Sequence, residues 1–325
     1  MPLSLSVLVV NYNGDKFIKE TISSFFEAIK NRKFEVEMLI LDNNSTDNST
    51  SVLSEIEREA KWPVKFYYGD DNIGFAKGCN FLAKEASNDV VFLLNNDTKT
   101  LCLDKFCHLL ENEQLDNNAI GTVKILNNDL TIQNNIFSFP SKLKLVLELF
   151  LLKHKLVSLI GRKNTNITAD TDFQNQYFSG CVLFLPRKLY LDFNGFDQRF
   201  YFYHEECDLF MRLDASGEGV KKVYLEDEIV HFGGGGGEIS DFAFVAYYEN
   251  LFRLFFYNTG ISYLCLSKLF KIAFKFRNFL SKMGIGYRYS PFSTTYKGLS
   301  NRSSQDVLKL NERILDKIQD KENFR

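Results

Sequence analysis

Several motifs that define large enzyme classes are missing from this chain of 325 residues. It has no GxGxxG and no GxxxxGK[ST], which disfavours nicotinamide-dependent dehydrogenases and P-loop enzymes. Its six cysteines show no CxxC or paired-finger spacing, so we expect small buried side chains and no zinc finger. No secretory signal is visible, and we expect a reducing, cytoplasmic compartment. No apolar run reaches membrane-spanning length, so a membrane contact would be peripheral.

Acidic residues are also missing from one long segment. Residues 250–305 contain nine Lys and Arg and no Asp or Glu, whereas residues 1–249 carry 25 basic and 36 acidic side chains. The basic segment is rich in Phe, Tyr and Leu, a composition that favours an anionic surface such as a membrane. The alternative is a solvated helix pair that covers the main domain. On charge alone we place a boundary near residue 245, between a catalytic domain (1–245) and a helical, basic-aromatic region (246–325).

Strand and helix patterns alternate through the first ninety residues. Buried strands are predicted at Leu5–Val10, Val36–Leu41, Val64–Tyr68 and Val90–Leu94, with helical patterns between them. Such alternation predicts right-handed βαβ units and a parallel sheet. The second half is less regular, and its patterns predict helices at Leu143–Ile160 and Glu205–Ala215 and strands at Phe178–Leu185 and Val220–Leu225.

Polar residues follow three of the predicted strands. Asp42 ends the second strand, Asn72 and Gly74 follow the third, and Asp97 follows the fourth. The carboxyl ends of parallel strands share one sheet edge, where open α/β folds bind ligands. Asp97 suits a divalent cation held against a diphosphate, and Asp42 can accept from the imide N–H of uracil or thymine. Each cluster alone is also typical of a turn or a helix N-cap.

Seven motifs in fixed order carry a family resemblance. They are Val-Val-Asn-Tyr-Asn (9–13), Leu-Asp-Asn-Asn-Ser-Thr-Asp (41–47), Asn-Ile-Gly-Phe-Ala-Lys-Gly-Cys-Asn (72–80), Leu-Leu-Asn-Asn-Asp-Thr (93–98), Gly-Phe-Asp (195–197), Tyr-His-Glu-Glu-Cys-Asp-Leu (203–209) with Arg212, and Val-His (230–231). The chain resembles family 2 glycosyltransferases of the GT-A fold, in the rhamnosyltransferase-like branch. The resemblance implies an α/β, Rossmann-like sandwich with a mainly parallel central sheet, followed by a helical C-terminal region.

The resemblance also implies roles for individual residues. The dependable metal ligand of the family falls on Asp97, with His231 as a second ligand of Mg²⁺ or Mn²⁺. A lone His at a strand end is alternatively a structural residue. The donor-binding positions are Asn11, Asn13, Asp42, Asn44, Asn72, Gly74 and Asn96.

The family's catalytic base lies in a Glu-Asp-X-Asp sequence, which here reads Glu205-Glu206-Cys207-Asp208. The base position therefore carries Glu206 in place of Asp, and Glu has a similar pKa with one more methylene. We prefer Glu206 as the base and keep Glu205 as the alternative, with Asp208 in the same catalytic motif. Acidic residues also simply favour a helix N-terminus.

The implied reaction is an inverting transfer of a sugar from a UDP- or dTDP-sugar, with dTDP-rhamnose as one candidate donor. The acceptor is a sugar hydroxyl of a glycan or lipid-linked glycan in bacterial surface polysaccharide synthesis, on the inner face of the cell membrane. We expect no nucleic-acid partner, and a homodimer is an alternative role for the C-terminal region. The Gly233–Gly237 run is either a loop that closes over the donor or a connector.

Three other functions were weighed against this one. A processive polysaccharide synthase needs a Gln-X-X-Arg-Trp motif, and Trp62 is the only tryptophan. A nucleotidyltransferase needs a Gly-rich, basic first loop, which residues 11–14 are not. A catalytically inactive nucleotide-sugar binding protein stays open, because Asn95 stands where a first metal-binding Asp sometimes occurs and Glu206 replaces the usual Asp.

Overall fold

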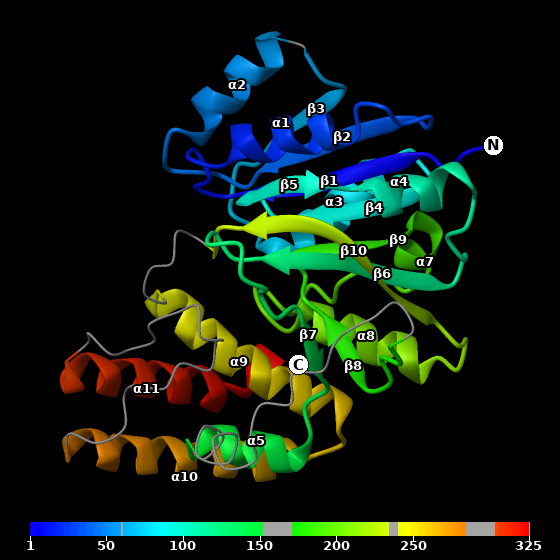
Figure 1. Cartoon of the computed structure of the whole chain (residues 1–325). Coiled ribbons are helices and arrows are strands. Elements are labelled where there is room, and N and C mark those ends of the chain that lie inside the picture. Colours follow the sequence, from blue (N-terminus) through cyan, green and yellow to red (C-terminus); the bar gives the residue numbers. More distant parts are fainter. Residues whose placement is uncertain (60, 152–170, 234–239, 284–302, 325) are drawn as a thin grey trace. The chain divides into compact units, whose positions relative to one another are not determined.

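A computed structural model describes residues 1–59, 61–151, 171–233, 240–283 and 303–324 (Figure 1). The chain forms two compact units. The first comprises Met1–Ser138, Ile167–Tyr201 and Glu205–Gly234, and the second comprises Phe139–Asn166, Phe202–His204 and Gly235–Arg325. The boundary near residue 245 stays a prediction for functional domains. The packing units differ from it because residues 139–149 and 202–204 group with the C-terminal helices.

The described part of the first unit is built on an eight-stranded sheet with the order β3-β2-β1-β4-β9-β6-β10-β5. The first half, β3 to β4, is parallel, and antiparallel pairings of β9 and β5 complete the mixed sheet. The strands are β1 (Leu5–Asn11), β2 (Val36–Asp42), β3 (Val64–Tyr68), β4 (Val90–Leu94), β5 (Thr98–Cys102), β6 (Ala119–Leu126), β9 (Val182–Pro186) and β10 (Lys221–His231), with a separate hairpin of β7 (Ile136–Ser138) and β8 (Gln176–Phe178). The mainly parallel α/β sheet predicted from the sequence is therefore confirmed.

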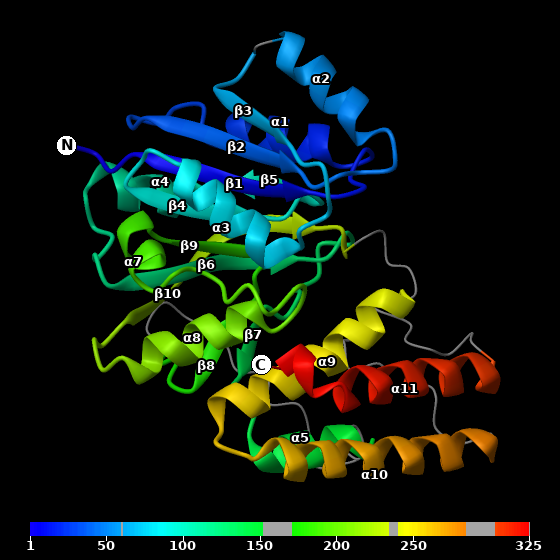
Figure 2. The same cartoon turned by 180° about the vertical axis from the view of Figure 1, so that it is seen from behind.

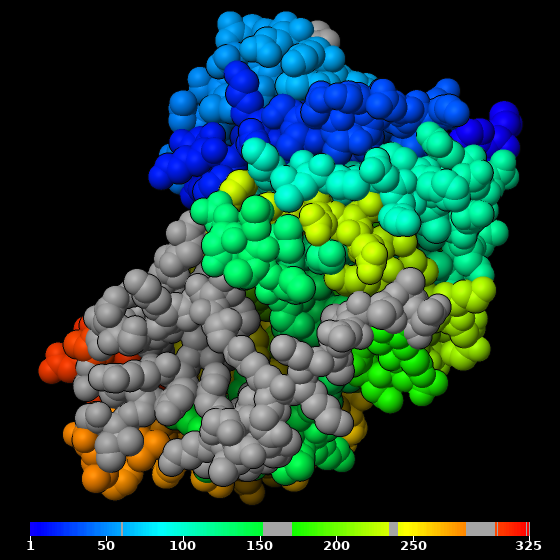
Figure 3. Space-filling view, viewed as in Figure 1, coloured from blue at the N-terminus to red at the C-terminus, as the bar shows by residue number. Residues whose placement is uncertain are grey.

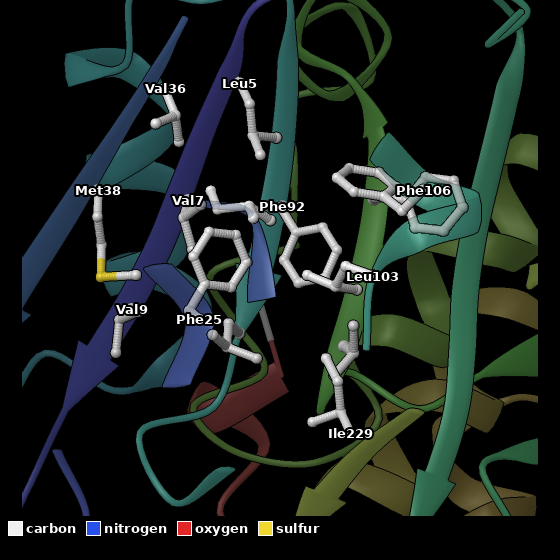
Figure 4. Packing of buried hydrophobic residues seen from close by; sticks show 14 of the residues in the cluster. Leu5, Val7, Val9, Phe25, Val36, Met38, Phe92, Leu103, Phe106 and Ile229 are labelled. Atoms are coloured by element: carbon white, nitrogen blue, oxygen red, sulfur yellow. The ribbon is translucent and has the colours of Figure 1, made fainter. Parts of the chain in front are cut away.

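Helices pack on both faces of this sheet because β1, β2 and β4 are buried along their whole length. Val7 and Val9 of β1 contribute to a large core with Phe25 and Phe106 (Figure 4). The opposite face of β1 carries Val10, which lies close to Gly78 (Figure 2 shows this side). The helices are α1 (Ile18–Ala28), α2 (Ser49–Glu59), α3 (Phe75–Glu85), α4 (Asp104–Glu111), α7 (Arg187–Asp192) and α8 (Glu205–Ala215).

Three elements of the second half differ from the sequence prediction. The strand predicted at Phe178–Leu185 is divided, because β8 ends at Phe178 and β9 begins at Val182. The strand predicted at Val220–Leu225 continues as β10 to His231 across a register shift between Leu225 and Glu228. The helix predicted at Leu143–Ile160 is α5 (Lys142–Leu149), and residues 152–160 lie outside the described ones.

The second unit is helical in its described residues. It contains α5, α9 (Asp241–Asn258), α10 (Tyr263–Lys282), α11 (Ser304–Gln319) and the short helix η2 (Lys321–Phe324). These helices share an apolar core that includes Leu149, Phe252, Phe274 and Ile314. Among the described helices, none combines the length and the hydropathy needed to cross a membrane.

Candidate functional site

The carboxyl ends of β1, β2 and β4 form one hydrogen-bonded edge. Asn11 donates to Asp42 Oδ1 at 2.8 Å, and Asn96 donates to Asn11 Oδ1 at 2.8 Å. Asn11 and Asp42 are both buried. Gly14 is required beside them, because a Cβ at this position would collide with the side chains of Asn11 and Asn96. Three predicted donor-binding residues are thus joined directly, in the arrangement that the parallel strands predict.

Asn13 links the turns after β1 and β2 by hydrogen bonds. Its backbone is left-handed (φ 53°), and its Oδ1 accepts the backbone N–H of Thr46 at 2.8 Å. Ser45 accepts the N–H of Asn13 at 2.9 Å and donates to Asp42 at 2.6 Å. Asn44 in the same turn is exposed and also left-handed (φ 61°).

Two residues that the sequence analysis missed anchor the loop after β3. Asn43 is buried, donates to Asn72 Oδ1 at 2.9 Å and accepts the N–H of Ile73 at 2.9 Å. The hydroxyl of Tyr201 donates to Asn72 Oδ1 at 2.6 Å. At Gly74 (φ 83°) a Cβ would lie 2.7 Å from the Tyr201 carbonyl oxygen, so only glycine fits. Asn43 could have been found as part of its motif, whereas no sequence signal pointed to Tyr201.

The predicted metal ligands lie side by side because β5 pairs with the end of β10, where His231 is opposite Thr98. His231 Nε2 is 3.2 Å from Asp97 Oδ1, and both side chains are about 15% exposed. Burial disfavours the charged imidazole, but interactions with Cys181 and Asp97 outweigh it and raise the pKa of His231. His231 Nδ1 is 3.1 Å from Gln133 Oε1. With that contact as an N–H donor, Nε2 is the nitrogen that faces Asp97, and a cation could use its lone pair only by displacing the proton that the raised pKa favours.

This donor set fits a divalent cation that is shared with a diphosphate. It offers one carboxylate and one imidazole nitrogen, ligand types that suit Mn²⁺ and, for the carboxylate, Mg²⁺. The described residues contain no group of three or more His, Cys, Asp or Glu that could hold a metal by themselves. Oxygens of a bound diphosphate would therefore have to complete the shell.

Glu205 and Glu206 begin α8 as a buried and a partly buried carboxyl group. Among the described residues, the Oε2 atom of each has no hydrogen-bond partner. Burial raises the pKa of Glu206 to about 7, although backbone amides, including that of Gly180, oppose the shift. Burial and then the neighbouring Glu206 raise the pKa of Glu205 well above its ordinary value as well. Both carboxyl groups therefore hold a proton more readily than an ordinary Glu does.

Gly180 and Cys181 connect the acidic pair with the predicted metal ligands. A Cβ on Gly180 would lie 3.9 Å from Glu205 Oε1 and from the Glu206 Cβ. The next residue, Cys181, accepts the N–H of Asn95 at 3.0 Å and interacts with His231. The two groups of residues are thus neighbours within the first unit.

Asp208 is placed differently from the two glutamates. Its Oδ2 accepts from Arg212 Nε at 2.7 Å, and the other nitrogens of Arg212 donate to the carbonyls of Phe193 and Gly195. The resulting clamp holds the turn of the Gly-Phe-Asp motif against α8. The geometry therefore favours a positioning role for Asp208.

Comparisons with known proteins show what the chain is similar to in sequence. Residues 6–163 match the sequence family described as glycosyl transferase family 2. Uncharacterized glycosyltransferases of Nostoc sp. and Mycoplasma genitalium are 28% and 30% identical over 29% of this chain, covering 28% and 32% of their own lengths. An uncharacterized protein of Haemophilus influenzae is 26% identical over 33% of this chain and 60% of its own length. This chain thus matches less than two thirds of each relative, and the matches support assignment to family 2.

Solved structures with the same fold share little sequence. A structure of S. aureus TarS 1–349 has a TM-score of 0.51 at 15% identity, covering 99% of this chain and 89% of that one. Mannosyltransferase PcManGT from Pyrobaculum calidifontis, in complex with GDP-Man and Mn²⁺, has a TM-score of 0.51 at 12% identity, covering 99% and 87%. GalNAc-T7 with UDP, GalNAc and Mn²⁺ has a TM-score of 0.50 at 11% identity, covering 71% and 43%. The predicted GT-A fold is confirmed.

Proposed function

We propose that this chain is an inverting glycosyltransferase that uses a UDP- or dTDP-sugar, dTDP-rhamnose being one candidate. The acceptor is a sugar hydroxyl of a glycan or lipid-linked glycan in bacterial surface polysaccharide synthesis. The family match and the GT-A fold support glycosyl transfer. The observation that carries the proposal is Glu206, a carboxyl with an unpartnered oxygen and a pKa near 7, next to the residues that adjoin Asp97 and His231.

The strand-end network is the proposed donor site. Asp42 would accept from the imide N–H of the base, held in place by Asn11 and Ser45. Asn72 and Gly74 bring backbone close to the nucleoside, with Asn13, Asn44 and Asn96 at the rim. Because most of these side chains already bond to one another, the site is pre-organised and loses little entropy on binding.

Asp97 and His231 are the proposed ligands of Mg²⁺ or Mn²⁺. When bound, such an ion would neutralise charge on the departing diphosphate. The relatives in complex with Mn²⁺ support this assignment by fold only.

Glu206 is the proposed base. The acceptor hydroxyl gives its proton to the Glu206 carboxylate while its oxygen attacks the anomeric carbon of the donor sugar. The bond from that carbon to the nucleotide diphosphate breaks on the opposite face, so a single displacement inverts the configuration. In this proposal Glu205, whose pKa is raised by burial and by the neighbouring Glu206, keeps its proton, so that the pocket holds one negative charge and not two.

The test is a panel of UDP-, dTDP- and GDP-sugars, each incubated with Mn²⁺ or Mg²⁺ and assayed for release of the nucleotide. Release from at least one UDP- or dTDP-sugar, lost with chelator, is the expected result. Binding of donor analogues without any release would instead support the inactive binding protein.

A further inference from the structure

In the second unit, only some side chains of the basic-aromatic region are packed in the helical core. Phe252, Phe255, Phe270 and Phe274 are buried in the helical core. Arg277 is buried as well, and its guanidinium donates to the carbonyl oxygens of Leu149 and Glu148 at 2.7 and 2.8 Å. These residues, which the sequence analysis counted toward a surface contact, are structural.

The exposed side chains of α10 form two parallel stripes along the helix, one apolar and one of lysines. Ile272, Phe276, Phe279 and Met283 form an apolar stripe, with exposed fractions of 60%, 39%, 59% and 58%. Lys268, Lys271, Lys275 and Lys282 are exposed along the adjoining side of the helix. At 100° per residue the two stripes occupy neighbouring arcs, directly opposite the buried arc of Leu266, Ala273 and Arg277. α10 contains no acidic residue.

The short helix α5 extends the apolar stripe. α5 and α10 are in contact, and the rings of Phe150 and Phe276 lie 5.7 Å apart (Figures 1 and 2). Leu143 is 68% exposed and Val146 is 37% exposed. Lys142 and Lys144 are exposed at the same helix, so that lysines occur on both helices beside the apolar side chains. Figure 3 shows part of α10 at the molecular surface.

We propose that this basic-apolar face, the exposed side of α10 and α5, binds the surface of an anionic lipid bilayer. Apolar side chains would enter the headgroup boundary while the flanking lysines meet anionic headgroups, which is how interfacial helices bind membranes. A second copy of this chain fits the face less well, because a two-fold contact would bring like-charged lysine stripes together with no acidic side chain on α10 between them. The proposal is independent of the transfer reaction.

Vesicle co-sedimentation of the full chain tests it, without donor or acceptor. Phosphatidylcholine vesicles are compared with vesicles that contain phosphatidylglycerol, at low and high salt. We expect binding to the anionic vesicles that weakens with salt. Changing Lys268, Lys271, Lys275 and Lys282 together to Gln should lower the partition coefficient by roughly a hundred-fold or more. A matched control changes four exposed lysines of the first unit, Lys33, Lys61, Lys84 and Lys105, to Gln.

A second variant, Ile272→Gln with Phe279→Gln, tests the apolar stripe at unchanged charge, and circular dichroism confirms that each variant folds. Weaker binding of both face variants with the control unchanged supports the proposal. Equal binding to both lipids, an equal loss in the lysine control, or no binding at all overturns it. Sedimentation velocity then shows whether the face forms a dimer instead.

Discussion

Glu37 and Glu206 are carboxyl groups of the same unit with opposite environments. Glu37 Oε1 accepts from Ser6, from the Ser87 hydroxyl and from the Ser87 N–H, while Oε2 lies 2.6 Å from Lys65 Nζ. Burial opposes its charge, but these donors prevail and lower the pKa of Glu37 to about 2. Burial raises the pKa of Glu206 to about 7. The hydrogen-bonded Glu37 carboxylate stabilises the fold, whereas Glu206, with one oxygen free of hydrogen bonds to the described residues, can accept a proton from a substrate.

Asp97 is a third carboxylate, and its removal should have the largest effect. Asp97→Ala should abolish turnover and metal-dependent donor binding, because loss of an activating cation costs several kcal/mol of transition-state stabilisation. Nucleotide release and donor calorimetry with Mn²⁺ measure both effects. Asp116→Ala, which removes an exposed partner of Lys221, is the matched control. Activity that persists in excess chelator would refute the metal assignment.

Glu206→Gln keeps the shape of the side chain and removes its basicity. We expect kcat to fall by roughly 10²–10⁴ while donor affinity stays near that of the unaltered chain. Glu205→Gln should have a smaller effect, since the proposal assigns the shared proton of the pair to Glu205, whose pKa is also raised. If Glu205→Gln gives the larger loss, the two roles are exchanged.

The pH dependence of kcat/KM gives a second test of Glu206 as the base. Because the Glu206 pKa is raised to about 7, the base is protonated below that value, and kcat/KM should fall about tenfold per pH unit there. Above pH 7 the rate should level off. In Glu206→Gln the fall of kcat/KM below pH 7 should disappear. A fall that persists in this variant would come from the titration of another group.

Local patterns were sufficient to locate the polar edge of the sheet. The buried runs of β2 and β4 mark their own ends, so Asp42 and Asp97 were placed at one edge before any contact was known, whereas Asn11 was named only through the family resemblance. The nearness of His231 to Asp97 could be suggested only by resemblance. It depends on the antiparallel pairing of β5 with β10, residues that are far apart in sequence.

Local patterns give no information about roles that depend on tertiary contacts. Tyr201 reaches Asn72 from 129 positions away, which no local pattern encodes. Asp208 looked catalytic from its motif, but its bond to Arg212 favours positioning. The predictions for Gly234–Gly237 concern residues outside the described ones.

Glu37→Gln should lower stability without lowering donor affinity. The lowered pKa means that the stabilisation is fully present above pH 4.5 and is lost as pH falls toward 2. The substitution removes charge-assisted bonds at a mostly buried site, so we expect a loss of about 2 kcal/mol at pH 7. Urea unfolding at pH 7 and pH 3 measures it, with exposed Glu218→Gln as control. A difference that fails to shrink at pH 3 would contradict the linkage.

The smallest effect should come from Lys65→Met, which tests how much of the Glu37 environment depends on a cation. Lys65 is the strongest single favourable partner of the Glu37 charge, yet its side chain is 53% exposed. Solvent screens such a pair, so the loss of unfolding free energy should stay below about 1 kcal/mol. The Glu37 pKa, followed by NMR, should rise but remain below its ordinary value, because Ser6 and Ser87 still donate to Oε1. A return to the ordinary pKa would mean that the lysine alone holds the charge.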